Sequence, residues 1–205
     1  MKFGIFAAAL VAAIGVTGVT LNAASDNTVK IQVFDQRGAP VRDAVIEFVP
    51  AQGTAGTIRF PWHMAMAQKD QQFVPDTLIV AKGSTVAFPN LDRVRHSVYS
   101  FSKAARFEID LYGRDQTRRQ NFPIAGTVAL GCNIHDNMTG HIRVVETPHA
   151  AKTDANGVVR LTGTPMGKGT VTVWHPQLRG KDNEFSGAIT IDSANDAKAV
   201  RIALR

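Results

Sequence analysis

The sequence predicts an all-β protein, and three observations support this class. Valine, isoleucine and threonine cluster in short runs, such as TVKIQVF at 28–34 and AKAVRIAL near the C-terminus, in which apolar and polar residues alternate. Glycine (17 residues) and proline (9 residues) are frequent and often separate these runs, where turns are expected. No long segment shows the apolar spacing of a helix.

The first 25 residues have the layout of a secretory signal peptide. Lys2 precedes an apolar run that begins at Phe3 and ends near Val19, and small residues follow at Ala23, Ala24 and Ser25. An uncleaved membrane anchor is the alternative, although the run is at the short limit for a spanning helix. We expect residues 1–25 to be removed, contact with a membrane only before cleavage, and a soluble periplasmic protein.

The formal net charge of +6 at pH 7 raises the question of nucleic-acid binding. The basic residues are scattered, aromatic residues make up only 7% of the chain, and export is predicted. We therefore predict that the protein binds no nucleic acid. A mildly basic face that attracts a negatively charged protein partner is the better use of this charge.

Residues 26–60 are expected to form a hairpin of two strands, TVKIQVF and AVIEFVP, joined by a turn at Gly38 and Pro40. Residues 148–205 supply further alternating strands. Residues on the expected inward faces are Val29, Ile31, Val33, Ala44, Ile46, Phe48, Val159, Leu161, Val171, Val173, Ile189, Ile191, Val200, Ile202 and Leu204. The G-x-P turn and the later TD-x-x-G segment resemble the transthyretin-like or carboxypeptidase-regulatory-like sandwich. This resemblance implies that residues 61–147 are inserted in that sandwich; alternatively, the hairpin packs directly on the middle segment.

The middle segment, 61–147, contains strand patterns on both sides of a charged stretch. QQFVPDTLIVAKGSTVAFPN and LDRVRHSVYSFS come before it, and NFPIAGTVALGCNIHDNMTGHIRVVE comes after it. The stretch 103–120 shows little periodicity. Val128, Leu130 and Cys132 share a strand face by the period of two, so the thiol is expected to point inward, and His96 shares a face with Val98.

Cys132 is the only cysteine in the chain. In an oxidising compartment a single thiol is buried and inert, paired with another chain, or bound to a metal. On a straight strand Cys132 and His135 would point to opposite faces, but Asn133, Asp136 and Asn137 in CNIHDNM favour a sharp turn. With Met138 from this loop and His96 from another strand, two imidazoles, a thiolate and a thioether would make a blue-copper electron-transfer site.

Other chemistries compete for this cluster of residues. A lone cysteine is often a small buried hydrophobe, and a nearby methionine is often packing. Zinc accepts cysteine and histidine, but methionine is a poor zinc ligand and a structural zinc site needs a fourth donor. A Cys–His nucleophile pair would make the protein an enzyme, but no orienting acid or oxyanion-hole motif accompanies it, so we predict that it is not one.

Three blocks in order resemble the cupredoxin family. They are F-x-P-x-x-L-x-V-x-x-G-x-x-V-x-F-x-N from Phe73, D-x-x-x-H from Asp92, and G-x-V-x-L-x-C-x-x-H-x-x-M from Gly126. The ligand loop is similar to that of plastocyanin and amicyanin, and the whole chain resembles the exported proteins labelled methylamine-utilization proteins. The resemblance implies an eight-stranded Greek-key sandwich, inserted in or packed beside the second small sandwich. It also implies one copper per chain, with ligands His96, Cys132, His135 and Met138.

The chain departs from this family near the expected metal. Ser97 stands where asparagine often braces the ligand loop, and its backbone N–H can still reach the thiolate. Ile134 stands where several carriers have proline, which leaves an additional backbone N–H near the Cys132 sulfur. Asn137, at a position that is often aromatic in close relatives, makes the surface around the exposed ligand more polar.

The sequence therefore predicts a periplasmic type 1 copper protein that carries single electrons, with the ring edge of His135 as the exit route. A copper-binding protein for metal handling or tolerance, without obligate electron transfer, is the alternative, and a second soft site at His63, Met64 and Met66 would favour it. Transient redox partners with an acidic docking face would meet a basic rim, formed by Arg93, Arg95, Arg106, Arg114, Arg118 and Arg119. The remaining histidines, His141, His149 and His175, are expected to be structural or to point outward.

Overall fold

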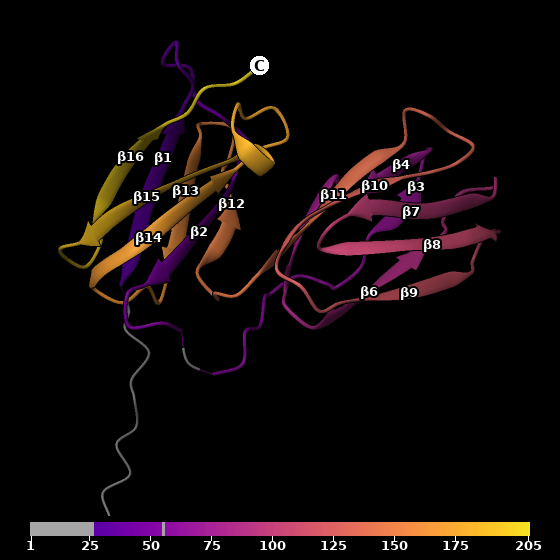
Figure 1. Ribbon diagram of the computed structural model, residues 1–205, viewed down its shortest axis with the longest axis horizontal. Helices are drawn as coiled ribbons and strands as arrows, with labels where there is room; N and C mark the ends of the chain where they lie inside the picture. Colours follow the sequence, from indigo (N-terminus) through magenta and orange to yellow (C-terminus); the bar gives the residue numbers. More distant parts are fainter. Residues whose placement is uncertain (1–26, 55) are drawn as a thin grey trace, which may run out of the picture.

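The computed structural model describes residues 27–54 and 56–205, so the predicted signal peptide lies outside the described residues. Strands make up nearly all of the regular structure, and the helical content is one short 3-10 turn, Lys181–Asn183. The all-β prediction is confirmed. Within the described residues no helix has the length and apolar character that crossing a membrane requires. The strands form two sandwiches that lie side by side (Figure 1).

The first sandwich, here called the terminal sandwich, is built from both ends of the chain. One of its sheets has the order β13 (Val158–Thr162), β1 (Thr28–Phe34) and β16 (Ala197–Arg201). The other has the order β12 (Ala150–Lys152), β2 (Val45–Pro50), β14 (Gly167–Trp174) and β15 (Glu184–Ile191). The apolar residues expected on the inward faces of these strands fill the space between the sheets.

The expected hairpin of 26–60 is wrong in its pairing. β1 pairs antiparallel with β13 and parallel with β16, whereas β2 pairs with β12 and β14 in the facing sheet. The alternation correctly indicated which residues point inward but not which strands pair. Ile31 and Phe48 contribute to the same core, but from opposite sheets. A hairpin and a pair of facing strands produce the same alternation, so the pattern could not separate them.

The second sandwich, here called the middle sandwich, lies between β2 and β12 in the sequence. Its large sheet has the order β5 (Thr77–Ala81), β11 (Thr139–Val145), β10 (Gly126–Gly131), β7 (His96–Ser102) and β8 (Ala105–Tyr112). Opposite lie β6 (Ser84–Pro89) with β9 (Thr117–Phe122), and the short hairpin β3 (Ala67–Lys69) with β4 (Gln72–Val74), which bridges to β6. Together β3 to β11 make nine strands, where the resemblance implied eight.

Two strands lie in the stretch 103–120 that showed little periodicity. β8 alternates half-buried Phe107 and Ile109 with exposed Arg106, Glu108 and Asp110, and it forms one edge of the large sheet. Charges on the outer side of an edge strand discourage pairing with other chains. The same charges reduced the apparent apolar signal of the strand.

An apolar cluster and a buried ion group join the two sandwiches. Val45, Ala150 and Trp174 of the terminal sandwich pack against Ile79 and Val145 of the middle sandwich.

Beside this cluster, Arg143 on β11 contacts the carboxylates of Glu47 on β2 and Glu184 on β15. This is why Val45 and Glu47, on the outer face of β2, are buried, although the sequence pattern indicated burial of the other face only. The limits 26–60, 61–147 and 148–205 remain our proposal for the domain organisation.

Candidate metal centre

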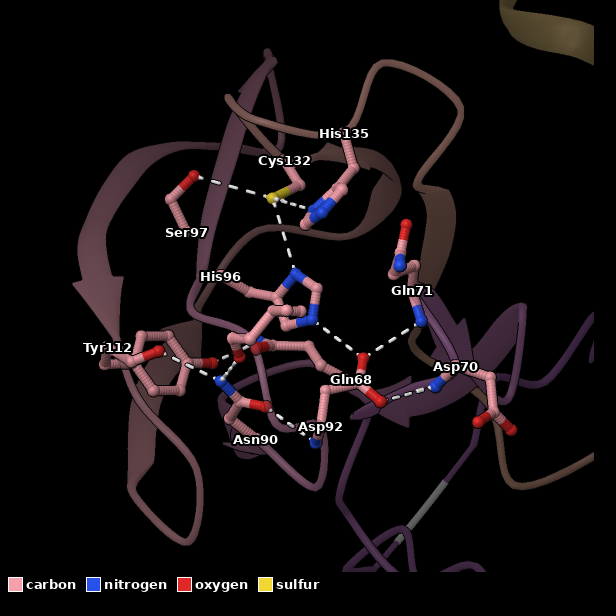
Figure 2. A network of polar contacts seen from close by, with 11 residues as sticks. Gln68, Asp70, Gln71, Asn90, Asp92, His96, Ser97, Tyr112, Cys132 and His135 are labelled. Atoms are coloured by element: carbon pink, nitrogen blue, oxygen red, sulfur yellow. Dashed lines mark hydrogen bonds and ion pairs between the residues drawn. The ribbon is translucent and has the colours of Figure 1, made fainter.

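Three donor atoms meet at one end of the middle sandwich. His96 is the first residue of β7, Cys132 follows the end of β10, and His135 lies in the loop that leads to β11. One ligand atom from each of these residues lies within 4.8 Å of the others. The Cys132 Sγ is 3.8 Å from the Nδ1 of His96 and 3.8 Å from the Nδ1 of His135. Figure 2 shows the thiol between the two imidazole groups.

The local sequence explains how Cys132 and His135 reach the same side. Turns at 133–134 and 136–137 interrupt the strand after Cys132, and the Met138 N–H donates to the His135 carbonyl at 2.9 Å. The expected reversal of the chain is therefore present. Met138 is fully buried and belongs to the same apolar cluster as Cys132, so the loop returns this side chain to the core of the middle sandwich.

Two of the three members of the cluster are buried. His96 and Cys132 are buried, whereas His135 is half-buried and its flanking residues Ile134 and Asp136 are exposed. The two imidazole rings lie with their centroids 4.8 Å apart. The exposed part of the site is thus the ligand loop around His135, as the sequence predicted.

Ser97 braces the ligand loop through its hydroxyl. Its hydroxyl accepts a hydrogen bond from the Asn133 N–H at 2.9 Å and lies 3.8 Å from the Cys132 Sγ, to which it donates. The Ile134 N–H, expected near the sulfur, is not among the hydrogen-bonding neighbours of Sγ in the described part of the chain. The protein donor to the sulfur is a side-chain hydroxyl, and sequence reasoning missed it because serine contacts the backbone in many loops.

Asp92 lies on the side of His96 that faces away from the thiol. Its Oδ2 is 2.8 Å from the His96 Nε2, and backbone N–H groups of Asp70 and Gln71 donate to its carboxylate (Figure 2). Burial alone would raise the pKa of Asp92, but the hydrogen bonds from Gln71, His96 and Asp70 outweigh it and hold that pKa below its usual value. The sequence signalled Asp92 only through the D-x-x-x-H spacing.

The donor set fits a soft, redox-active metal ion such as copper. A thiolate and an imidazole bind first-row metal ions at about 2.3 and about 2.1 Å. A single small ion can therefore contact Sγ and both Nδ1 atoms at the observed separations. Two imidazoles with one thiolate, and Met138 in the same core cluster as Cys132, match the blue-copper set better than a structural zinc set.

The second soft site expected at His63, Met64 and Met66 is not assembled. Met66 is buried in the core of the middle sandwich, and Met64 packs against that core from its edge. His63 is exposed, because successive residues of an extended segment point to opposite sides. The feature that would have favoured metal handling therefore has a packing explanation.

The other three described histidines each contact a residue of the terminal sandwich. The His141 ring packs against Trp174 with centroids 5.1 Å apart, so this residue contacts the terminal sandwich and does not point freely outward. The His149 ring lies near Phe48, and the His175 Nδ1 accepts from the Gln177 N–H. Burial lowers the pKa of all three histidines, as expected of structural residues.

The arginines expected to form a basic rim are all exposed. Arg93 and Arg95 lie in the loop that leads into His96, and the Arg95 guanidinium donates to the Leu111 carbonyl. Arg106 and Arg118 stack over the rings of Phe101 and Tyr112. Within the described residues, only Arg114 of this group has a carboxylate within 4 Å, that of Asp115.

A scan against protein-family models and a search of curated proteins found no match for this chain. Solved structures gave partial similarities. A copper-containing nitrite reductase from Thermus scotoductus SA-01 is 24% identical, with 46% of this chain and 25% of that chain covered and a TM-score of 0.40. The present chain thus spans a quarter of that enzyme.

A reduced variant of amicyanin is 21% identical, with 50% of this chain and 99% of that chain covered and a TM-score of 0.38. A purple cupredoxin from Nitrosopumilus maritimus is 18% identical, with 40% and 98% covered and a TM-score of 0.36. Values this low carry no argument about function, which depends on the side chains of the site.

Proposed function

We propose that this chain is a type 1 copper protein that carries single electrons between periplasmic redox partners and catalyses no reaction of its own. The observation that supports it is the convergence of the Cys132 Sγ with two imidazole Nδ1 atoms in a buried site. His96, Cys132 and His135 would hold one copper ion, and Met138 would supply the weak axial contact. Bound copper would supply a one-electron couple.

The protein contributes rigidity and insulation to this function. His96 is held within a sheet, and the Ser97 hydroxyl ties the ligand loop to that sheet through Asn133. A ligand set that moves little between the two oxidation states keeps the reorganisation energy of electron transfer low. The buried surroundings of Cys132 exclude water from the thiolate.

Exposed apolar residues in the two loops that carry or precede the histidines suit a brief encounter with a partner. The apolar side chain of Ile134, next to His135 in the sequence, is 49% exposed. In the loop before His96, Leu91 is 50% exposed and Val94 is 42% exposed. Arg93 and Arg95 are interspersed with Leu91 and Val94. Exposed apolar side chains interspersed with basic residues favour weak, electrostatically steered association with an acidic redox protein.

Titration of the apo-protein with Cu(II) tests the function. We expect one equivalent to bind with an intense visible thiolate-to-copper charge-transfer band and a reversible one-electron wave in voltammetry. Cys132→Ala should abolish the band, because the sulfur that produces it is gone.

His63→Ala is the matched control, since His63 is exposed and lies outside the cluster of donors. This variant should retain the band and the single equivalent. Copper binding without a charge-transfer band, or binding that Cys132→Ala leaves intact, would instead favour the metal-handling function.

A further inference from the structure

Asp92 and the thiol occupy opposite sides of the His96 ring. The Nδ1 of His96 faces the Cys132 Sγ at 3.8 Å, and its Nε2 is 2.8 Å from the Asp92 Oδ2. Because His96 is fully buried, no water competes for either nitrogen. An Nε2 that donates to a carboxylate leaves the lone pair of Nδ1 directed at the metal position.

The Asp92 carboxylate is itself fixed by the β3–β4 turn. The N–H of Asp70 donates to Oδ1 at 2.6 Å and the N–H of Gln71 donates to Oδ2 at 2.9 Å. Both turn residues have positive φ, 54° and 58°, a region that side-chain-bearing residues seldom adopt. This conformation directs two successive amides at one carboxylate, which is the arrangement of an anion-binding nest.

The backbone of Asp92 is held as firmly as its side chain. Its N–H donates to the Asn90 Oδ1 at 2.9 Å, and the Asn90 Nδ2 donates to the carbonyls of Val94 and Tyr112. Asn90 is fully buried, and the Leu91 N–H bonds to the Gln68 carbonyl of β3. The carboxylate is therefore held in place from both the β3–β4 hairpin and the loop that leads into β7.

We propose that Asp92 is a positioning residue of the copper centre, and that the 70–71 turn fixes it so that its negative charge lowers the reduction potential through His96. This inference rests on the proposed function. A carboxylate partner fixes the ring orientation of a metal-binding imidazole and raises its basicity. A more basic imidazole with a negative charge beside it favours Cu(II) over Cu(I), so the oxidised state is stabilised.

A purely structural role would have a different signature. If Asp92 only anchored the hairpin, replacing it would change the stability of the fold but leave the ratio of Cu(II) to Cu(I) affinity unchanged. The potential reports that ratio and not the stability. The two roles are therefore separable in one variant.

Asp92→Asn removes the charge but keeps an oxygen that can accept from the His96 Nε2. In the copper-loaded protein we expect the ratio of Cu(II) to Cu(I) affinity to fall about tenfold, which corresponds to a potential higher by about 59 mV for one electron. Voltammetry measures the shift. Asp110→Asn is the control, because it removes an exposed carboxylate of β8 close in sequence to Tyr112, the strand partner of His96, and it should change the potential far less.

An unchanged potential in Asp92→Asn, or an equal shift in Asp110→Asn, would overturn the inference. The apo-protein gives a second test that needs no variant and no copper. Nitrogen NMR should show His96 as the tautomer protonated at Nε2, with a slowly exchanging ring proton. Protonation at Nδ1 alone would contradict the proposed role of Asp92, whereas absence of a copper band in the wild-type protein would contradict only the proposed function.

Discussion

Ser97 shows how much one hydroxyl can do at a metal site. It accepts from the loop backbone at Asn133 and donates to the Cys132 sulfur, so it couples the shape of the loop to the electron density of the thiolate. Asparagine at this position would have a longer side chain with separate donor and acceptor atoms. Serine uses a single oxygen for both contacts.

Ser97→Ala should lower the potential. Loss of the donor leaves more electron density on the sulfur, which stabilises Cu(II) by about 1 kcal/mol, the net value of an ordinary hydrogen bond. Voltammetry of the copper-loaded variant checks this. Ser100→Ala, also buried on β7 but bonded to Ser102, should leave the potential unchanged; a potential that does not fall in Ser97→Ala would show that the hydroxyl acts only on the loop.

The residues that could be predicted from the sequence at this scale were those with distinctive chemistry. Cys132, His135 and His96 were found because thiol and imidazole are rare and their spacing is informative. Asp92 was assigned no role, and for Ser97 only its backbone N–H was expected to reach the thiolate. Acidic and hydroxyl residues are common, and these two act here through partners far along the chain. The Asp92 contacts with Asp70 and Gln71 span more than 20 residues and depend on a turn whose positive φ no local pattern revealed.

Strand β10 presents a glycine next to Cys132 for a steric reason. A Cβ on Gly131 would lie 2.5 Å from the ring of Tyr99, the residue paired with it on β7. The ring covers the backbone of β10 at the point where the ligand loop begins. β7, which begins with His96, and β10, which ends beside Cys132, are therefore in contact where the ligand loop begins.

Gly131→Ala should destabilise the fold by about 1–3 kcal/mol, the usual cost of overpacking a tight site. Chemical unfolding of the apo-protein measures the change in the free energy of unfolding. Tyr99→Ala combined with Gly131→Ala should recover part of the loss relative to the sum of the single changes, because the ring that collides is gone. Simple additivity of the two changes would exclude this contact as the cause.

Strands were predictable where alternation came with turn residues, but their partners were not. β1 and β2 were found at nearly their true limits, yet they belong to facing sheets because their partners lie more than 100 residues away. β8 was missed because exposed Arg106, Glu108 and Asp110 obscured the half-buried residues between them. Pairing depends on distant parts of the chain, and an edge strand carries little apolar signal.

At the scale of the whole molecule, a buried ion group supplements the apolar cluster that joins the two sandwiches. In this group Arg143 is the one cation, and it forms salt bridges with two carboxylates, those of Glu47 and Glu184. Burial raises the pKa of Glu47, and the charge and hydrogen bonds of Arg143 oppose that rise. Removing Arg143 together with Glu47 should therefore reduce the stability of the fold less than removing Arg143 alone.

Arg143→Met should lower the free energy of unfolding by about 3–5 kcal/mol, since it leaves a buried carboxylate without a partner. Adding Glu47→Leu should restore much of this loss. Lys82→Met, which breaks the exposed pair with Glu146, is the control and should cost at most about 1 kcal/mol. Equilibrium chemical unfolding compares the variants, and equal losses for Arg143→Met and Lys82→Met would show that burial of the pair has no energetic consequence.

The terminal sandwich has a consequence for the order in which the chain can fold. A protein is synthesised from its N-terminus, so β1 and β2 emerge first, but their partners β13, β16, β12 and β14 emerge only after all strands of the middle sandwich. The middle sandwich can complete its sheets while the first two strands still have exposed edges. The strands that are made first are thus the last to be paired, and their edges need protection until the C-terminus is complete.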